Sequence, residues 1–373
     1  MLTKTLAGEI VRETSLRLSR NVNIMNNEGV IIASCDESRI DTVHEGARQV
    51  IETGQPFLIH EKESGIFEGS QPGINLPIVF QESIVGVIGV TGDPGEMNDI
   101  GGLVKMTTEL MMKQEYLASQ SEWTQRTKEM IIEELLQKEP SYDHIYRGLD
   151  LLNVELQSPL RLALIQLAPD RTAPNQAVIQ AIESPLKRGT GFSGFTHTHR
   201  LALLTSTESE PQFLDVLRQI QSACKHLHLN NRIVYSNAFT ELDECKQAYA
   251  DCDLSLAISD EQLTLVSFAN VESRALIHQL DKAAARRFAE RVLTDAVQKQ
   301  ADTLTAFFLN SLNIQKTADD LFIHRNTLLY RLDKIKESAG YDPKNFHDAV
   351  TLQMALWVHS LTGEGRSGLP PKA

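Results

Sequence analysis

The stretch "IHRNTLLYRLDKIK", residues 323–336, decides what can be predicted for the C-terminal part of the chain. Leu328, Leu332 and Ile335 recur at three- and four-residue spacing, which is typical of the buried face of a helix. The same periodicity turns the basic side chains of the stretch outward. It therefore predicts a helix with one apolar and one cationic face.

A shorter helix is predicted just upstream, in "NIQKTADDL" (313–321). Thr317 and Asp320 have the spacing of a capping box, so we expect Thr317 to cap this helix. Ala318 is small enough to let a second helix cross closely. Two helices joined by a sharp turn predict a helix-turn-helix.

In a helix-turn-helix the second helix enters the major groove of DNA. Arg325 suits the edge of a guanine and Asn326 that of an adenine, whereas later side chains suit phosphates. A simpler interpretation stays open, in which Asn326 only caps the helix and the cations form a solvated face. The predicted DNA-binding residues are His324, Arg325, Asn326, Thr327, Tyr330, Arg331 and Lys334.

The charge of the whole chain argues against non-specific attraction to nucleic acid. The 373 residues carry a formal net charge of -13, so a phosphate backbone repels most of the molecule. DNA binding must therefore be local. The length predicts two or three domains, and the 42% hydrophobic and 23% charged content is that of a soluble globular protein.

The cysteines and the apolar runs predict a cytoplasmic protein without a metal or cofactor. Cys35, Cys224, Cys245 and Cys252 form no C-x-x-C pair and have no metal-ligand spacing, so we expect free thiols in a reducing compartment. Charges interrupt the first 21 residues, and no signal-peptide core can be drawn. The apolar run 83–92 is too short to span a bilayer, so no membrane contact is expected.

The remaining patterns predict an α+β multidomain protein. The N-terminal part has helix and hairpin patterns that suit a compact sensor, and a long proline-free helix with an exposed apolar stripe follows as a connector ended by Pro140. Strands and helices then alternate as in an α/β sandwich, before a nearly all-helical C-terminal part and a disordered tail. In chain order these are helices 2–19 and 41–53, hairpins 22–34 and 73–92, the connector 96–138, the α/β region 160–268, the helical region 275–361 and the tail 362–373.

Two resemblances to known families add to this interpretation. "FIHRNTLLYRLDKIKESAGYDP" (322–343), with the helix "AVTLQMALWV" (349–358), resembles the C-terminal helix-turn-helix of the PucR and CdaR transcriptional regulators. "NVNIMNNEGVIIAS" (21–34), "SRIDTVHEGA" (38–47), "GINLPI" (73–78) and "VGVIGVTG" (85–92) resemble the sugar diacid recognition domain of the carbohydrate diacid regulators.

The resemblance implies a regulator that senses a small hydroxy-carboxylate of the glucarate, galactarate or glycerate class and usually activates genes. Its partners would be a double-stranded DNA operator and a second copy of the chain. Family members often have a basic residue where this chain has Gln71, which leaves room for a smaller or less charged acid. The implied domains are 1–135 for ligand sensing with the connector, 136–270 for a degenerate GGDEF-like domain, and 271–373 for a helical domain with the helix-turn-helix at about 300–361.

A bound carboxylate needs fixed donors, because it loses its hydration on entering a pocket. Arg39, predicted at a helix entrance, and His44, one and a half turns further on, are the main candidates, and Glu45 could orient the histidine. Each also has a structural alternative: Arg39 pairs with Asp36, His44 is an ordinary helix histidine, and the glycines only form turns. The predicted ligand-binding set is Arg39, His44, Glu45, Gly73, Asn75, Thr91 and Gly92.

The resemblance of the middle region to a GGDEF domain, the fold of cyclic-dinucleotide synthases, leaves one enzymatic alternative. Such a signalling enzyme or cyclic-nucleotide binder needs carboxylates for metals, and the corresponding hairpin "GFTHTHRLALLTS" (194–206) has none. His197 and His199 share a strand face without an acidic partner, so we interpret them as exposed hairpin residues. We therefore expect the middle region to have no catalytic residues and to serve as a spacer or a dimer surface.

Overall fold

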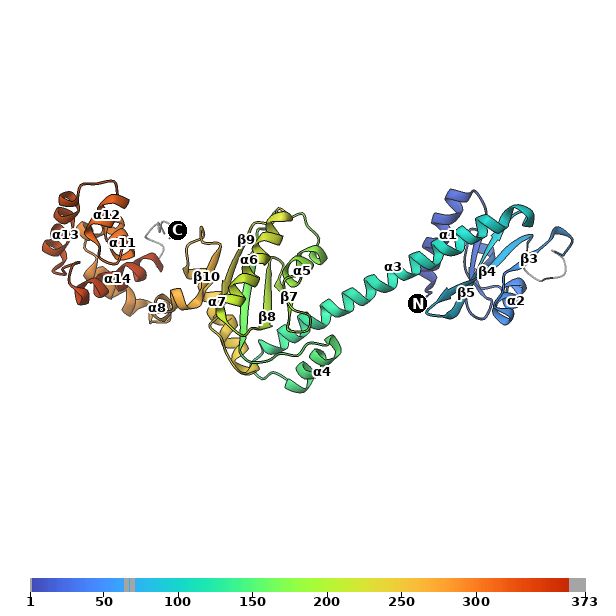
Figure 1. The fold of residues 1–373 in the computed structure, drawn as a ribbon, viewed down its shortest axis with the longest axis horizontal. Helices are drawn as coiled ribbons and strands as arrows, with labels where there is room; N and C mark the ends of the chain where they lie inside the picture. The colour runs from blue at the N-terminus through green and yellow to red at the C-terminus, as the bar shows by residue number, and fades with distance from the viewer. Residues whose placement is uncertain (1, 64–66, 68–70, 362–373) are drawn as a thin grey trace. The chain divides into compact units, whose positions relative to one another are not determined.

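The computed structural model describes residues 2–63, 67 and 71–361, and the predicted disordered tail 362–373 lies outside these residues. The chain divides into two compact units, Met1–Thr124 and Gln125–Ala373, called here the N-terminal and C-terminal units. The division falls within helix α3 (Pro94–Leu135), which runs from one unit into the other (Figure 1). This helix corresponds to the predicted connector.

The N-terminal unit is built on one antiparallel sheet with strand order β2-β1-β5-β4-β3. Helix α1 (Lys4–Leu18) and the first part of α3 pack on one face, and the short helix α2 (Glu45–Thr53) packs on the other. The predicted hairpins are present, but sequence patterns did not reveal β3. The strands are β1 (Val22–Met25), β2 (Ile31–Ser34), β3 (Phe57–Ile59), β4 (Gly73–Phe80) and β5 (Ser83–Thr91).

Alternation along β4 assigns each side chain to one of these two faces. Ile74, Leu76 and Ile78 point to the core shared with α1 and α3. Asn75 therefore lies on the α2 side, where Met25 and Val87 form a smaller core with that helix. A buried polar residue on a sheet face that otherwise packs apolar side chains marks that face as a candidate site.

The predicted start of α2 is wrong. The helix begins at Glu45 rather than at residue 41, and a short 3₁₀ turn, η1 (Glu37–Arg39), precedes it. The cause is tertiary, because residues 41–43 pair with β2: Ile31 donates to Thr42 O over 2.9 Å, and Asp41 donates to Ile31 O over 2.9 Å. Backbone groups engaged there cannot form the first helical turn.

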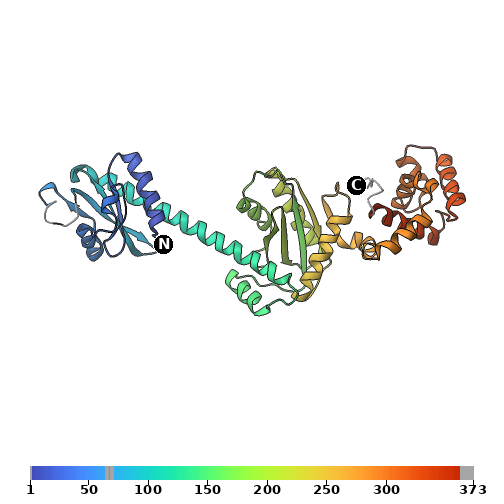
Figure 2. The same cartoon turned by 180° about the vertical axis from the view of Figure 1, so that it is seen from behind.

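The C-terminal unit contains a second five-stranded sheet, with strand order β10-β9-β6-β8-β7 (Figure 2). Helices α5 and α6 pack on one face, and α4, α7 and the end of α3 pack on the other. Helix α4 was not predicted. The elements are α4 (Tyr142–Leu152), β6 (Leu160–Leu167), α5 (Asn175–Glu183), β7 (Gly191–His197), β8 (Arg200–Ser206), α6 (Glu210–His226), β9 (Asn231–Tyr235), α7 (Cys245–Ile258) and β10 (Leu265–Ser267).

The edge strand β7 is covered by side chains of helices. The Ser193 amide donates to Glu183 Oε1 over 2.8 Å, and the Phe195 amide donates to Glu129 Oε1 over 3.3 Å. Gly194 is needed between them, because a Cβ there would lie 2.9 Å from Ile132 Cδ1 of α3. Covered in this way, the edge is not free to pair with another strand.

In the described part of the C-terminal unit, helices α8 to α14 follow the second sheet. A core among the later helices contains Phe307 of α11, Ala318 of α12, three residues of α13 and Leu352 of α14. Among the helices of the described residues, none is both long and apolar enough to cross a bilayer. The helices are α8 (Phe268–His278), α9 (Lys282–Val292), α10 (Asp295–Gln298), α11 (Ala301–Leu309), α12 (Ile314–Asp320), α13 (Arg325–Ala339) and α14 (Phe346–Leu361).

Candidate DNA-binding surface and ligand site

Helices α12 and α13 form the predicted pair, joined by the turn 321–324. Leu328, Leu332 and Ile335 of α13 are fully buried, as their spacing predicted. Ala318 of α12 is also buried, with 1% of its surface exposed, so the second helix crosses closely at a small side chain. The outward face of α13 is thereby fixed by packing.

The predicted capping box of α12 is wrong. Asn313 caps the helix, because its Oδ1 accepts from the Lys316 amide over 2.9 Å. Thr317 lies inside the helix, fully buried, and its hydroxyl donates to Asn313 O over 2.7 Å. Asp320 instead accepts from Asn310 Nδ2 over 2.7 Å, which joins α12 to the end of α11. An asparagine four residues earlier thus supplied the stronger cap.

Most of the predicted DNA-binding residues are exposed. His324 caps α13, since its Nδ1 accepts from the Asn326 amide over 3.3 Å, and this leaves the Asn326 side chain out of the cap. Arg331 does not point outward as predicted: it is half-buried and donates to Thr303 Oγ1 of α11 over 3.2 Å. The exposed members are His324, Arg325, Asn326, Thr327, Tyr330 and Lys334.

Ion pairs engage two of the charged side chains in the second half of α13. Lys336 is bound to Asp342 over 2.9 Å, and Asp333 is bound to Lys344 over 2.7 Å. Arg325 and Lys334 make no hydrogen bond or ion pair with the residues that the structure describes. Two unpaired cations on a helix that also exposes the Asn326 carboxamide can bind phosphates and base edges.

The N-terminal unit brings two of the predicted ligand residues together at Gly46, in the first turn of α2. A Cβ at this glycine would lie 3.1 Å from Asn75 Nδ2 and 3.2 Å from His44 Cε1. His44, before α2, and Asn75, on β4, therefore meet at the helix N-terminus. A helix N-terminus favours anions, because its backbone amides carry partial positive charge.

His44 is a buried, neutral imidazole with 4% of its surface exposed. Burial lowers its pKa to about 4, and the nearby positive charge of Arg39 lowers it as well. Its Nδ1 accepts from the Ala47 amide over 3.1 Å, so the ring proton is on Nε2. His44 is therefore the cap of α2 rather than a helix residue, and Nε2 is a donor for a ligand.

Asn75 is buried, with 3% of its surface exposed, and its carboxamide has no hydrogen-bond partner among the described residues. Gly89 lies opposite it on β5, where a Cβ would be 2.8 Å from Asn75 Oδ1. The glycine thus makes room for the carboxamide. Sequence reasoning missed Gly46 and Gly89, although a glycine within a strand is a signal of such close approach.

The other predicted ligand residues do not join His44 and Asn75 at Gly46. The amide and hydroxyl of Thr91 both donate to Asn21 O, over 3.0 and 3.1 Å, and the Gly92 amide donates to Pro72 O over 3.0 Å. These donors close the end of the sheet and are already engaged. Gly73 is packed against β5, since a Cβ would lie 2.2 Å from Val90 O. Glu45 is half-buried in the first turn of α2.

The depressed pKa of His44 predicts a pH dependence of stability. An unfolded histidine binds a proton near pH 6.5, whereas folded His44 binds one only near pH 4, so its contribution is complete above pH 6.5 and is lost as the pH falls toward 4. We expect the loss of unfolding free energy between pH 7 and pH 5 to be about 2 kcal/mol smaller in His44→Asn than in the unchanged chain. Urea unfolding at both pH values measures this difference.

Asparagine keeps the helix cap, so the substitution removes the titration without removing the N-cap acceptor. The exposed His144, replaced by asparagine, is the matched control and should leave the pH dependence unchanged. Equal pH dependence in both variants would show that His44 is not held neutral by the fold.

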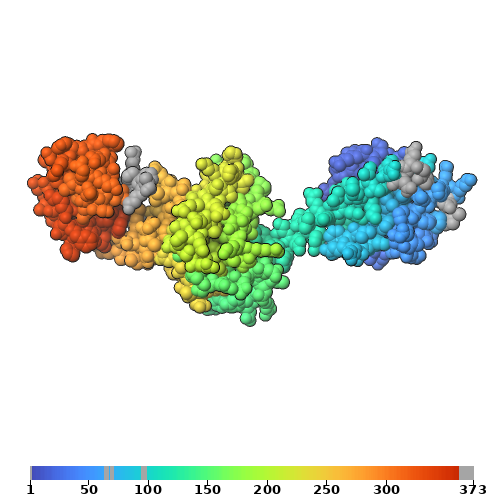
Figure 3. Space-filling view, viewed as in Figure 1, coloured from blue at the N-terminus to red at the C-terminus, as the bar shows by residue number. Residues whose placement is uncertain are grey.

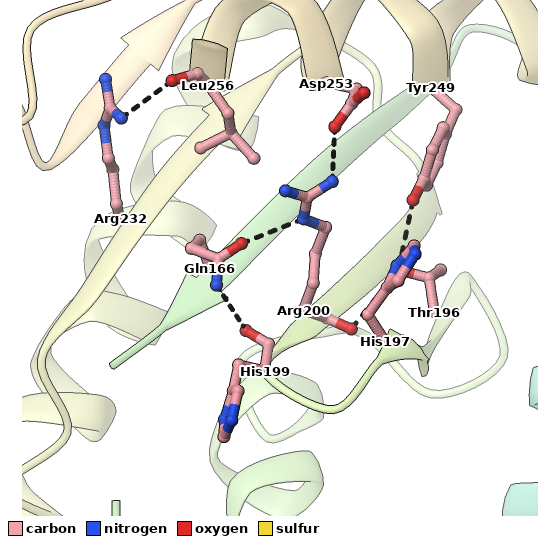
Figure 4. A network of polar contacts seen from close by, with 9 residues as sticks. All are labelled: Gln166, Thr196, His197, His199, Arg200, Arg232, Tyr249, Asp253 and Leu256. Atoms are coloured by element: carbon pink, nitrogen blue, oxygen red, sulfur yellow. Dashed lines mark hydrogen bonds and ion pairs between the residues drawn. The ribbon is translucent and has the colours of Figure 1, made fainter. Parts of the chain in front are cut away.

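The hairpin between β7 and β8 is held by polar contacts rather than arranged as a metal site (Figure 4). Arg200 donates through Nε to Gln166 Oε1 over 3.0 Å and forms an ion pair with Asp253 of α7. Gln166 Nε2 in turn donates to His199 O over 3.2 Å. Within the described residues no three His, Cys, Asp or Glu side chains are grouped to hold a metal ion.

Comparison with protein families identifies the class of the protein. Residues 2–135 match the family described as putative sugar diacid recognition, residues 137–258 match the GGDEF-like domain, and residues 300–358 match the PucR C-terminal helix-turn-helix domain. The chain is thus a transcription regulator that joins a sugar diacid recognition domain to a PucR-type helix-turn-helix. The predicted resemblance and the α+β multidomain fold class are confirmed.

Similar proteins cover nearly the whole chain. The carbohydrate diacid regulator of Escherichia coli is 28% identical, over 95% of this chain and 97% of its own length. An uncharacterized protein of Bacillus subtilis, YsfB, is 27% identical over 95% of this chain and 98% of its own. Among solved structures, a regulator of polyketide synthase expression from Bifidobacterium adolescentis covers 63% of this chain and 93% of its own, with 18% identity and a TM-score of 0.31.

Proposed function

We propose that the chain binds a DNA operator through α13 and that a small sugar acid bound in the N-terminal unit controls this binding. The observation that carries the proposal is that α13 exposes Arg325 and Asn326 in its first turn and Lys334 in its third, and that neither cation is paired with a described residue. In a protein with net charge -13, such a surface has a purpose other than general solubility. The protein would act in the cytoplasm, where its operator lies, and most simply as an activator.

The proposed ligand is a hydroxy-carboxylate of the glucarate, galactarate or glycerate class. Its carboxylate would accept from His44 Nε2 and lie near the N-terminus of α2, with the charge of Arg39 close by. The Asn75 carboxamide, buried and without a partner among the described residues, would donate to or accept from a ligand hydroxyl. These polar groups suit an acid that carries hydroxyl groups, and they suit an apolar ligand less well.

A thermal-shift screen with glucarate, galactarate and glycerate tests the ligand site. An acid at 100 times its dissociation constant adds about 2.7 kcal/mol of stability to the unchanged protein. We expect Asn75→Leu to abolish this shift, because leucine keeps the branched shape of the side chain but cannot hydrogen-bond to a hydroxyl. The measurement is the unfolding midpoint with and without each acid.

The matched control is Gln55→Leu, which removes an exposed carboxamide from the same unit and should keep the shift. A shift of equal size in Asn75→Leu would exclude this residue from the ligand site. If none of the acids shifted the unchanged protein, the proposed ligand class would be wrong.

Signal transfer requires that the ligand favour one arrangement of the protein over another. Helix α3 begins three residues after the end of β5, so a change at this sheet is passed to it directly. Its last turns are bound to the β7 edge through Glu129 and Ile132. We propose that the second sheet, β10-β9-β6-β8-β7, is a structural support in this path. We also propose that the protein acts as a homodimer, since one small helix-turn-helix reads only a half-site.

A further inference from the structure

Helix α3 has apolar residues on two opposite faces within the N-terminal unit. One set is buried against the sheet: Gly101, Val104, Thr108 and Met112. The other set is exposed, with 60% of Leu103, 51% of Met106, 57% of Leu110 and 53% of Leu117 accessible. At 3.6 residues per turn the exposed four lie within roughly 60° of arc, on the side opposite the buried set. We call these four residues the outer stripe.

The spacing of the outer stripe is that of a helix-to-helix seam. Intervals of three, four and seven residues between successive members are those of the a and d positions of a heptad. A helix on the surface of a globular protein has one apolar stripe, directed to its own core. A second stripe on the opposite side therefore indicates a second packing partner.

The same helix is exposed on all sides just beyond Leu117. All residues from 117 to 123 are exposed, and Figure 3 shows this stretch as a single rod of side chains. Isolated helices shorter than about 12 to 15 residues are marginal in water, and most helices in proteins are stabilised by packing. A partner helix along the outer stripe would bury part of this exposed surface.

We propose that the outer stripe pairs with the outer stripe of a second copy of the chain, in parallel and in register. The charge of the segment permits this, because residues 103–124 contain two lysines and three glutamates, a net charge of -1, although the whole chain carries -13. Lys113, beside the stripe, can extend its ammonium group to water. The polar tail 362–373 has one large apolar residue, Leu369, and is a poor cover for four side chains.

The parallel orientation rests on the proposed function. Two helix-turn-helix parts can read two half-sites of one operator when both leave the helix pair at the same end. Self-association itself does not depend on DNA binding. It is therefore measured without DNA and without a ligand, so that its failure is distinguishable from failure of the proposed function.

Disulfide cross-linking of the full chain tests both pairing and orientation. The background is Cys35→Ser, because Cys35 is exposed whereas Cys224, Cys245 and Cys252 are buried. Met106→Cys and Leu117→Cys, each introduced singly, are expected to form cross-linked dimers at least about 10-fold faster than Glu115→Cys, whose side chain is exposed on the other side of the helix. The two stripe positions are about 16 Å apart along the axis, so both can self-link only in a parallel pair.

Cross-linking at only one of the two stripe positions would overturn the parallel arrangement. Equal rates at the stripe and at the Glu115 position would show random collision rather than pairing. Both results are read from non-reducing gels of the oxidised protein.

A charge variant tests whether the outer stripe holds the copies together. Leu110→Glu combined with Leu117→Glu is expected to raise the dimer dissociation constant by at least about 100-fold, measured by light scattering after gel filtration. Ala118→Glu with Ser119→Glu adds the same charge at exposed positions outside the stripe and should leave a dimer. Circular dichroism shows whether each variant is folded. A monomeric unchanged protein, or a folded Leu110/Leu117 variant that stays dimeric, would overturn the proposal.

Discussion

We expect the replacement of Arg325 by alanine to lower operator affinity by about 10- to 100-fold and to weaken the preference for one base pair. The exposed guanidinium is unpaired among the described residues and lies at the first position of α13, where a bidentate contact to a guanine contributes about 1 to 3 kcal/mol of discrimination. The measurement is binding to a set of operators mutated at single base pairs, at one salt concentration, because affinity for DNA depends strongly on salt.

Two comparisons distinguish base reading from a general charge effect. Lys334→Ala removes a proposed phosphate contact and should weaken binding evenly across the operator set, lowering the salt slope by about one. Arg188→Ala removes an exposed arginine from the turn between α5 and β7 and should change neither affinity nor preference. If Arg325→Ala left the footprint and base preference unchanged, the role proposed for this residue would be refuted.

Replacing Arg232 by methionine destabilises the C-terminal unit by about 3 kcal/mol. Its guanidinium donates to Leu256 O of α7 over 3.0 Å (Figure 4). It also donates to the carbonyl and hydroxyl oxygens of Ser259 over 2.7 Å, to Asp260 O over 2.8 Å and to Leu263 O over 3.2 Å, just after the end of this helix. Methionine keeps the apolar stem but leaves these acceptors without a donor, and each unsatisfied buried group costs about 1 kcal/mol or more.

Urea unfolding followed by circular dichroism measures the loss. Arg218→Met is the control, because Arg218 is exposed and pairs only with Asp215 three residues away, so its loss should change stability by less than about 0.5 kcal/mol. Equal midpoints for the two variants would mean that the carbonyls at the end of α7 find other partners.

Local patterns predicted most elements of both sheets and the helix-turn-helix. Gly29 has φ +81°, as the short turn between β1 and β2 requires, and Gly54 ends α2 with φ +70°. Two of the errors have tertiary causes. Residues 41–43 favoured a helix by their local pattern but pair with β2, and Arg331 had the spacing of an outward residue but reaches Thr303 of α11.

The sequence by itself determined the buried face of α13, the turn glycines and the long connector helix with an exposed apolar stripe, because each depends on residues within a few positions of one another. Only the tertiary structure decided that His44 and Asn75, which are 31 residues apart, meet at Gly46, and that Arg325 and Lys334 keep free charges while neighbouring ions are paired. The physical reason is that such contacts form only after whole helices and strands have packed, and no local periodicity specifies which side chains that packing brings together.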